Sequence, residues 1–374
     1  AGADFSATVE AVLWDTDDDN NIPGGDGIID VGRSYNDNTK VPGYAWLTTL
    51  DALSSGFEPS SGTLGDLLRD LDTTVELSQA EFLDNTNPTK GTVTINDLRY
   101  SEVGSFTLRA DATDYLTAGV NINSDDIIVG RFRPDYFQLS NVVQGSLQDS
   151  CAATYTYIGE SFGYQVNPSF KVTAFNALDN PTANYTGGWS KLSVTSFDIS
   201  TLTQDATNFL DVVHTPATPR VDALGDNADG SFDVTFANDS FCYGLGAGCI
   251  KQANSMIAEF TANLNLLLSE VSDGEAITAL SQNFNPTGNT LRFGRLAMDN
   301  VFGSELMNLV MPMKTEFFNG TNFVKNSDDN CTIVQDSELN PVPASFGSMG
   351  VSILTGPIAS GGDLNITLTA PGAG

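Results

Sequence analysis

The sequence predicts an all-β protein, a tandem array of immunoglobulin-like β-sandwich domains with little helix. Many short segments alternate apolar with polar residues and are rich in Val, Thr and aromatic residues, which is the pattern of half-buried antiparallel strands. Clusters of Asn, Asp, Pro and Gly separate these segments and indicate turns. Short strands at this spacing are typical of β-sandwiches.

The clearest strand signals are spread over the whole chain, and two of them lie close to its ends. They are residues 5–14 (FSATVEAVLW), 91–95 (GTVTI), 104–110 (GSFTLRA), 170–174 (FKVTA), 230–236 (GSFDVTF) and 363–369 (DLNITLT).

Helix is expected in few places. Residues 64–71 could form two helical turns. Residues 256–271 fit both the helical and the strand period, but the apolar side chains from Phe260 to Leu268 alternate cleanly. We therefore predict one long strand there.

Composition shifts divide the chain into three expected domains, residues 1–130, 131–286 and 287–374. The apolar run IIVGRFRPDYF (127–137) leaves an Ala-, Thr- and Asp-rich segment and contains Pro134, after which strand signals start afresh. A turn cluster at 283–289 precedes the run LRFGRL (291–296), which opens the last domain.

The charge balance excludes two classes of partner. The 374 residues include 47 acidic and 16 basic side chains, which gives a net charge of −31. Binding to nucleic acid or to an anionic membrane surface needs clustered Lys and Arg, which this chain lacks. The longest apolar runs are far shorter than the roughly 20 residues of a membrane helix, so we expect no membrane insertion. Asp-rich composition suits an exported protein working outside the cell, and a halophilic cytosolic protein is the alternative.

The four cysteines allow three pairings. The run FCYGLGAGC places three glycines between Cys242 and Cys249, which lets a short loop fold back, so we predict a disulfide there. Cys151 and Cys331 then pair by elimination, which would link the second and third domains. Zinc binding is the alternative, but the chain has no CxxC spacing and a single histidine.

The segment DTDDDNNIPGGD (15–26) has the spacing of a calcium loop, with oxygen-bearing side chains at alternate positions and a final carboxylate. Asn20 replaces the usual glycine, and strand signals precede the segment, so we expect a calcium loop without flanking helices. The alternative is a solvated acidic loop. The expected ligands are Asp15, Asp17, Asp19, Asn21, Asp26 and Asp30.

No set of catalytic residues is apparent, and we predict that the protein is not an enzyme. His214 is the only histidine, so a Ser-His-Asp hydrolase would need it. No GxSxG motif occurs, and an ordinary strand-end histidine is the simpler interpretation. The run GLGAG (244–248) lacks the Lys of a phosphate loop and is interpreted as part of the disulfide loop.

Aromatic side chains could form a platform for sugar rings. The candidates are Tyr155, Tyr157, Phe162 and Tyr164. Because alternation places Tyr155 and Tyr157 on one face of a strand, a stripe of core residues is the other interpretation. We expect Trp14, Trp46 and Trp189 to lie in the core.

Several runs in order resemble the C-terminal region of MshQ-like proteins, which are encoded with the mannose-sensitive haemagglutinin (MSHA) type IV pilus of aquatic Gammaproteobacteria. They are DATDYLTAGV, IIVGRFRPDYF, YTYIGESFGYQVNPSFKVTAFNALDNPTANYTG, LRFGRLAMDNVFGSELMNLVMPMKTEFFNG and FVKNSDDNCT. The resemblance implies an exported, pilus-associated protein of β-rich modules, without catalytic residues. It also implies a further segment beyond APGAG. Within the region that resembles MshQ-like proteins, residues 170–187 also resemble the immunoglobulin-like repeats of bacterial adhesins. We expect a strand that ends at Ala174 and a next strand that starts at Tyr185.

The function expected is therefore structural and adhesive: a component of a pilus or surface filament of a Gram-negative bacterium, stabilised by disulfides and calcium. A carbohydrate-binding module is the alternative, and a secreted hydrolase is less favoured. The expected partners are other filament subunits, a glycan, or a second copy of the chain. A second copy could exchange the terminal strands 5–14 and 363–369, because strands at chain ends leave edges open to pairing. The alternative is that both strands pair within their own domains.

Overall fold

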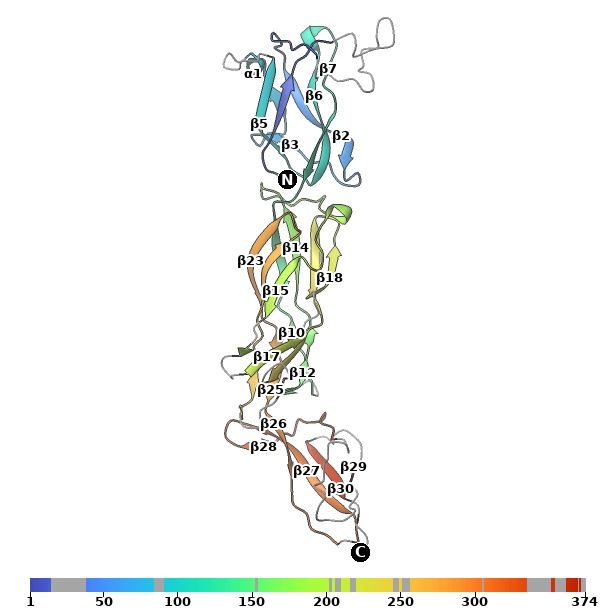
Figure 1. Cartoon of the computed structure of the whole chain (residues 1–374), viewed down its shortest axis with the longest axis vertical. Helices are drawn as coiled ribbons and strands as arrows, with labels where there is room; N and C mark the ends of the chain where they lie inside the picture. The colour runs from blue at the N-terminus through green and yellow to red at the C-terminus, as the bar shows by residue number, and fades with distance from the viewer. Residues whose placement is uncertain are drawn as a thin grey trace.

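The structure is a computed structural model that describes residues 1–14, 38–83, 91–151, 154–201, 204–205, 210–215, 220–244, 249–250, 256–304, 306–334, 351–353, 361–368 and 370. Its regular structure is almost entirely β-strand, arranged in three modules that lie end to end as an elongated rod (Figure 1). Within these ranges, no helix is long and apolar enough to cross a membrane. We call the three units the N-terminal, middle and C-terminal modules.

The N-terminal module is a sandwich of two sheets. One sheet has the order β1-β5-β3, and the other has the order β4-β2-β6-β7 with β8 also paired to β6. Tyr100 and Phe106, one from each sheet, stack with their ring centroids 4.4 Å apart. The elements are β1 (Phe5–Glu10), β2 (Thr48–Glu58), β3 (Leu67–Arg69), β4 (Val75–Leu77), α1 (Gln79–Phe82), β5 (Thr92–Tyr100), β6 (Gly104–Ala112), the 3-10 turn η2 (Tyr115–Thr117), β7 (Ile122–Asn123) and β8 (Ile127–Phe132).

The middle module is a longer sandwich with one continuous core. Its first layers are the sheets β18-β19-β14-β9 and β15-β22-β23, and Phe170 of the first packs on Phe197 and Phe284 of the second. Three further sheets, β12-β20-β17-β16, β13-β10-β24 and β11-β25-β21, lie toward the C-terminal module (Figure 1).

The elements of the middle module begin at residue 136 and end at residue 292. They are β9 (Tyr136–Val143), β10 (Ser146–Leu147), β11 (Thr156–Tyr157), β12 (Ser161–Phe162), β13 (Tyr164–Val166), β14 (Ser169–Phe175), the 3-10 turn η3 (Gly187–Trp189), β15 (Phe197–Thr201), β16 (Gln204–Asp205), β17 (Leu210–Thr215), β18 (Val221–Asp226), β19 (Ser231–Phe236), β20 (Ser240–Gly244), β21 (Phe260–Thr261), β22 (Leu266–Ser272), β23 (Ile277–Phe284), β24 (Thr287–Gly288) and β25 (Thr290–Arg292).

The described part of the C-terminal module is a five-stranded sheet. Its order is β26-β27-β30-β29, with β28 also paired to β27. Met313, Leu364 and Ile366 are buried on one face of this sheet. The strands are β26 (Gly294–Met298), β27 (Leu309–Phe318), β28 (Phe323–Lys325), β29 (Val351–Ile353) and β30 (Asp363–Leu368).

The structure confirms the predicted fold class of tandem immunoglobulin-like β-sandwiches. In β14, every second side chain is buried, from Phe170 to Ala174, as the alternation of its sequence predicts. The two terminal strands pair inside their own modules, since β1 lies beside β5, and β30 lies between β27 and β29. The pairs β10–β24 and β11–β25 are parallel, which the sequence did not indicate.

The prediction of helical turns at residues 64–71 was wrong. Residues 67–69 form β3, which pairs with β5, and Leu67 and Leu68 are buried. Asp70 and Leu71 have φ angles of 50° and 66°, a left-handed conformation that ends a right-handed helix. Pairing with a strand distant in sequence therefore overrides the local helical period.

The prediction of one long strand at residues 256–271 was partly right: the segment forms β-structure, but it is divided into two strands, β21 and β22. β21 pairs with β25, whereas β22 pairs with β15 and β23 in another sheet. Between them the chain crosses from one sheet to the other, and the backbone N–H of Asn263 donates to the Tyr243 hydroxyl. Alternation continues through the crossing because the apolar side chains enter the same core.

Two smaller expectations were also wrong. Trp14 is 46% exposed, because it lies beyond the end of β1 and outside the sheet. Trp46 and Trp189 pack partly buried against the cores.

Tyr185 does not start a strand: it is buried in the turn that follows β14, and the next strand is β15.

Candidate functional site

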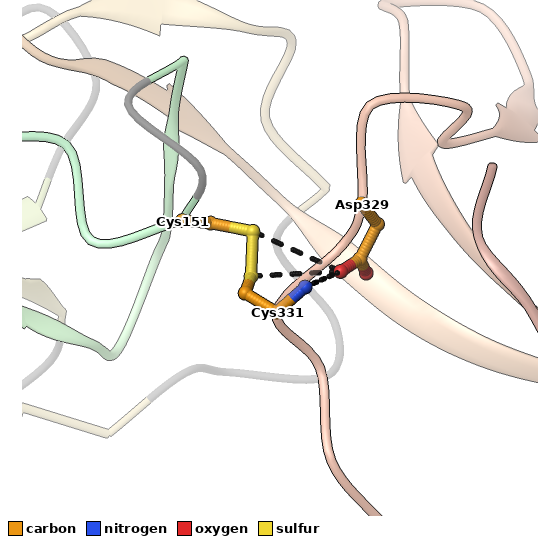
Figure 2. Close-up of side chains that lie close together, drawn as sticks. All are labelled: Cys151, Asp329 and Cys331. Carbon is orange, nitrogen blue, oxygen red and sulfur yellow. Dashed lines mark hydrogen bonds between the residues drawn. A yellow bond between two sulfur atoms is a disulfide. The ribbon is translucent and has the colours of Figure 1, made fainter. Parts of the chain in front are cut away.

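The junction between the middle and C-terminal modules contains a disulfide. Cys151 and Cys331 are joined with their Cα atoms 5.4 Å apart (Figure 2). Cys151 follows β10 of the middle module, and Cys331 follows β28 of the C-terminal module. The second bond, between Cys242 and Cys249, lies within the middle module. Both are the pairs that the sequence favours.

The length of chain that the Cys151–Cys331 bond closes makes it the more stabilising of the two. Its cysteines are 180 residues apart, against 7 for Cys242 and Cys249. In the chain-entropy account, closing a loop of that length in the unfolded chain contributes roughly 5 kcal/mol to the folded state. The bond therefore stabilises both modules and also holds them together.

Asp329 lies beside the interdomain disulfide and is fully buried (Figure 2). Its carboxylate accepts hydrogen bonds from the backbone N–H groups of Cys331 (3.1 Å) and Thr332 (3.0 Å), and from the hydroxyls of Thr332 (2.7 Å) and Tyr157 (2.8 Å). Burial alone would raise the pKa of Asp329, but these hydrogen bonds outweigh it and the pKa is lowered. The carboxylate is therefore held in its charged form by both modules.

A chain of hydrogen bonds extends from Asp329 into the middle module. Tyr157 donates to Asp329 and accepts from the Asn326 amide at 2.7 Å, and the Asn326 oxygen accepts from the Arg292 guanidinium at 2.8 Å. Arg292 lies between two rings, 4.5 Å from the centroid of Tyr155 and 4.4 Å from that of Phe317. Residues 155, 157 and 292 belong to the middle module, whereas 317, 326 and 329 belong to the C-terminal module. We call this set, together with the Cys151–Cys331 bond, the latch.

The latch is not arranged as a metal site. Cys151, Cys331 and Asp329 bring sulfur and oxygen atoms within 4.8 Å of one another. Metal ions bind the cysteine thiolate, and both sulfurs here are used in the disulfide. Both oxygens of Asp329 already accept hydrogen bonds from protein donors. The carboxylate contacts the sulfurs at 3.8 and 3.5 Å, and these are van der Waals contacts because a disulfide sulfur carries no hydrogen.

The junction between the N-terminal and middle modules is built around Glu102, in the turn between β5 and β6. One carboxylate oxygen accepts from the backbone N–H of Ala183 at 2.9 Å, and the other accepts from those of Asn184 and Val103, both at 3.2 Å. Burial raises the pKa of Glu102, and the three N–H donors offset part of that effect. The N-terminal module thus places a carboxylate on a turn of the middle module.

Two buried asparagines from successive turns of the segment between β14 and β15 complete this contact. Asn184 is 2% exposed, accepts from the backbone N–H of Thr63 at 2.9 Å and donates to the Thr63 carbonyl at 2.7 Å. Asn176 donates to the Ser101 carbonyl at 2.8 Å, while its own oxygen accepts from the N–H groups of its turn. A buried amide with every partner in place fixes orientation, because leaving one unpaired is costly.

Ion pairs close the edge of this junction. Glu275, from the turn between β22 and β23, pairs with Arg131 of the N-terminal module and with Lys191 of the middle module. The Arg133 guanidinium donates to the Glu275 carbonyl. These groups are more exposed than the asparagines, so they contribute less to stability.

The expected calcium ligands lie outside the described residues. They are Asp15, Asp17, Asp19, Asn21, Asp26 and Asp30.

His214 lies in β17, with its side chain 7% exposed. Its ring stacks on Phe241, its Nδ1 accepts from the Arg220 guanidinium at 2.8 Å, and its Nε2 is 3.5 Å from the Asp239 carboxylate. No hydroxyl nucleophile contacts the ring among the residues that the structure describes. The arrangement is that of a buried polar cluster between strands rather than a hydrolase triad.

The four aromatic residues considered as a sugar platform face inward. Tyr155 and Phe162 are buried, and Tyr157 and Tyr164 are partly buried. Tyr155 and Tyr157 meet edge to face, 5.0 Å apart, inside the latch. These four residues are therefore better described as core residues than as a platform for sugar rings.

Sequence reasoning missed the residues that join the modules. Asp329 lies two positions before Cys331, so its position near the disulfide could have been predicted from the sequence. Glu102 and Asn184 had none, because their partners are 81 and 121 residues away in the chain.

Comparisons with known proteins give two family matches, and two of the similar solved structures are weak likenesses to bacterial surface proteins. The structures are FdeC, an adhesin of Escherichia coli (13% identity, TM-score 0.23, covering 86% of this chain and 76% of that one), and invasin, a bacterial integrin-binding protein (10% identity, TM-score 0.26, covering 99% and 55%). The chain thus spans about half of the invasin structure. No curated protein sequence matches the chain.

The family matches cover the middle and C-terminal modules and also β6, β7 and β8 of the N-terminal module. Residues 102–296 match the DUF6701 third domain, and residues 292–374 match the DUF6701 fourth domain. The two ranges overlap at β25 and β26, where the latch residue Arg292 lies. Because the third-domain match alone covers more than half of the sequence, the chain belongs to the DUF6701 family.

Proposed function

We propose that this chain is a rigid, load-bearing segment of an exported bacterial surface protein, with a structural and adhesive role. The observation that carries the proposal is the latch, which joins two modules through a covalent bond and a buried hydrogen-bond chain. Flexible linkers are the usual connection between domains that move independently. Here each junction contains buried side chains that are hydrogen-bonded across it, Asn184 at the first and Asp329 at the second, so the three modules hold a fixed extended shape.

The two disulfides support an oxidising location, because such bonds form and persist outside the reducing cytosol. The resemblance to MshQ-like proteins supports a more specific place, in or beside an MSHA-type pilus. On this proposal the partners are other filament subunits, and calcium bound at residues 15–30 stabilises the N-terminal module.

Attachment assays with mutant strains of the source bacterium test the proposal. Deletion of the gene is expected to reduce attachment to surfaces, and a strain carrying Cys151→Ser and Cys331→Ser is expected to show the same defect in part. Immunoblots of the exported protein control for its amount. Attachment and surface filaments both unchanged after the deletion would contradict the proposal.

A further inference from the structure

We infer that the Cys151–Cys331 disulfide diverts tension around most of the middle module. When a folded chain is pulled from its two ends, the force follows the covalent backbone. At Cys151 that path branches, because the disulfide leads directly to Cys331 and skips the 180-residue interval between them. The interval is closed into a covalent loop, so tension cannot draw it out while the bond is intact.

The strands fall on two sides of this branch point. β11 to β28 lie inside the loop, and these include most of the middle module and the first three strands of the C-terminal module. The N-terminal module, β9, β10, β29 and β30 lie outside it. Under tension, the strands outside the loop can be pulled from their sheets and extended. The enclosed strands, such as β14 and β19, can lose their pairing but cannot be extended along the pulling direction.

The surroundings of the bond favour this role. Cys151 is fully buried, and Tyr155 Oη lies 3.0 Å from its sulfur. Reductants and competing thiols need access to a sulfur atom for exchange. The latch thus restricts access to the Cys151 sulfur for as long as the junction stays folded, whereas Cys331 is only partly buried.

The inference concerns the connectivity of the chain, so it does not require the proposed adhesive role, and it is tested on the purified protein. Single molecules held at residues 1 and 374 are stretched to full extension in an optical or magnetic trap. With the bond intact, the maximum extension is expected to be roughly 700 Å; with it broken, it is expected to be roughly 1,300 Å, at about 3.5 Å per residue.

Wild-type protein supplies both states, so a misfolded variant cannot obscure the result. A stretched molecule is exposed to dithiothreitol, which gives two electrons to the disulfide, leaves two cysteine thiols and closes into its own cyclic disulfide. An increase of roughly 600 Å at constant force is expected when the 180-residue loop is released.

The second disulfide provides a matched control. Cys242 and Cys249 lie inside the closed loop, so the variant Cys242→Ser/Cys249→Ser is expected to reach the same extension as the wild type before reduction. The variant Cys151→Ser/Cys331→Ser is expected to reach the full 1,300 Å, roughly, without any reductant. Full extension of the oxidised wild type, or no lengthening after dithiothreitol, would overturn the inference.

Discussion

Asp329 shows how one side chain can join two modules. It is buried beside a disulfide, and its four hydrogen-bond donors come from Cys331, Thr332 and Tyr157. Donors of this kind favour the charged carboxylate, which is why its pKa is lowered although burial acts in the opposite direction.

The lowered pKa of Asp329 predicts an acid-sensitive junction. A carboxylate with a lower pKa in the folded state stabilises the protein above its unfolded pKa of about 3.9, and this contribution is lost as the pH falls through the folded value. Asp329→Asn replaces an acceptor by a donor and is expected to cost about 2 kcal/mol at neutral pH. Denaturant melts between pH 6 and pH 2 measure both effects.

The variant should also show less loss of stability in acid than the wild type. Asp363→Asn is the control, since Asp363 forms an exposed ion pair with Lys325 and its removal is expected to cost less than 1 kcal/mol. Equal acid sensitivity in Asp329→Asn and wild type would show that Asp329 does not set this dependence.

At the scale of elements, local sequence patterns correctly predicted the strands whose conformation is evident from their own residues. The alternation of β14 is visible in five residues, and β14 formed as expected. Residues 67–69 look helical in isolation, but they became β3 because Leu67 lies opposite Tyr100, 33 positions later in the chain. The break between β21 and β22 has the same origin, since each strand follows partners in a different sheet.

The acidic segment 15–30 remains a prediction about one element, a calcium loop. Its carboxylates should repel one another without a cation. If calcium binds only the folded protein, a hundredfold excess over Kd stabilises it by about 2.7 kcal/mol. We expect a higher melting temperature in calcium than in a chelator, and expect Asp15→Asn/Asp19→Asn to remove the difference. Identical melting curves of the wild type in calcium and chelator would exclude the site.

At the scale of the whole molecule, the sequence predicted β-sandwiches in tandem but not how rigidly they are joined. The short glycine-rich loop predicted the Cys242–Cys249 disulfide, and the Cys151–Cys331 pair followed by elimination. Asn184 could not, because an asparagine in a turn is ordinary until Thr63, 121 residues earlier, is placed against it. Junctions depend on pairs of distant residues, and a single sequence holds no signal for such pairs.

Asn184→Ala is therefore expected to loosen the rod at its first junction. The substitution leaves the N–H and carbonyl of Thr63 unpaired and is expected to cost about 2–3 kcal/mol of junction stability. Small-angle scattering should show a broader range of lengths, while the separate modules still melt cooperatively. Asn180→Ala is the control, because the side chain of Asn180 is exposed and donates to the Leu178 carbonyl within its own turn. Scattering curves that coincide for both variants and wild type would show that Asn184 does not hold the junction.

The position of Glu102 has a consequence for how such proteins are assembled during evolution. The stretch that matches the third family domain begins at this residue and ends after Arg292. Glu102 fastens the N-terminal module to the turn at 183–184, and Arg292 belongs to the latch at the opposite end. A gene segment with these limits carries a connector for each of its neighbours, and it also carries β6, β7 and β8, which form one sheet with β2 and β4. A recombination event that transplants it would therefore preserve the first attachment only beside a module whose strands can complete that sheet.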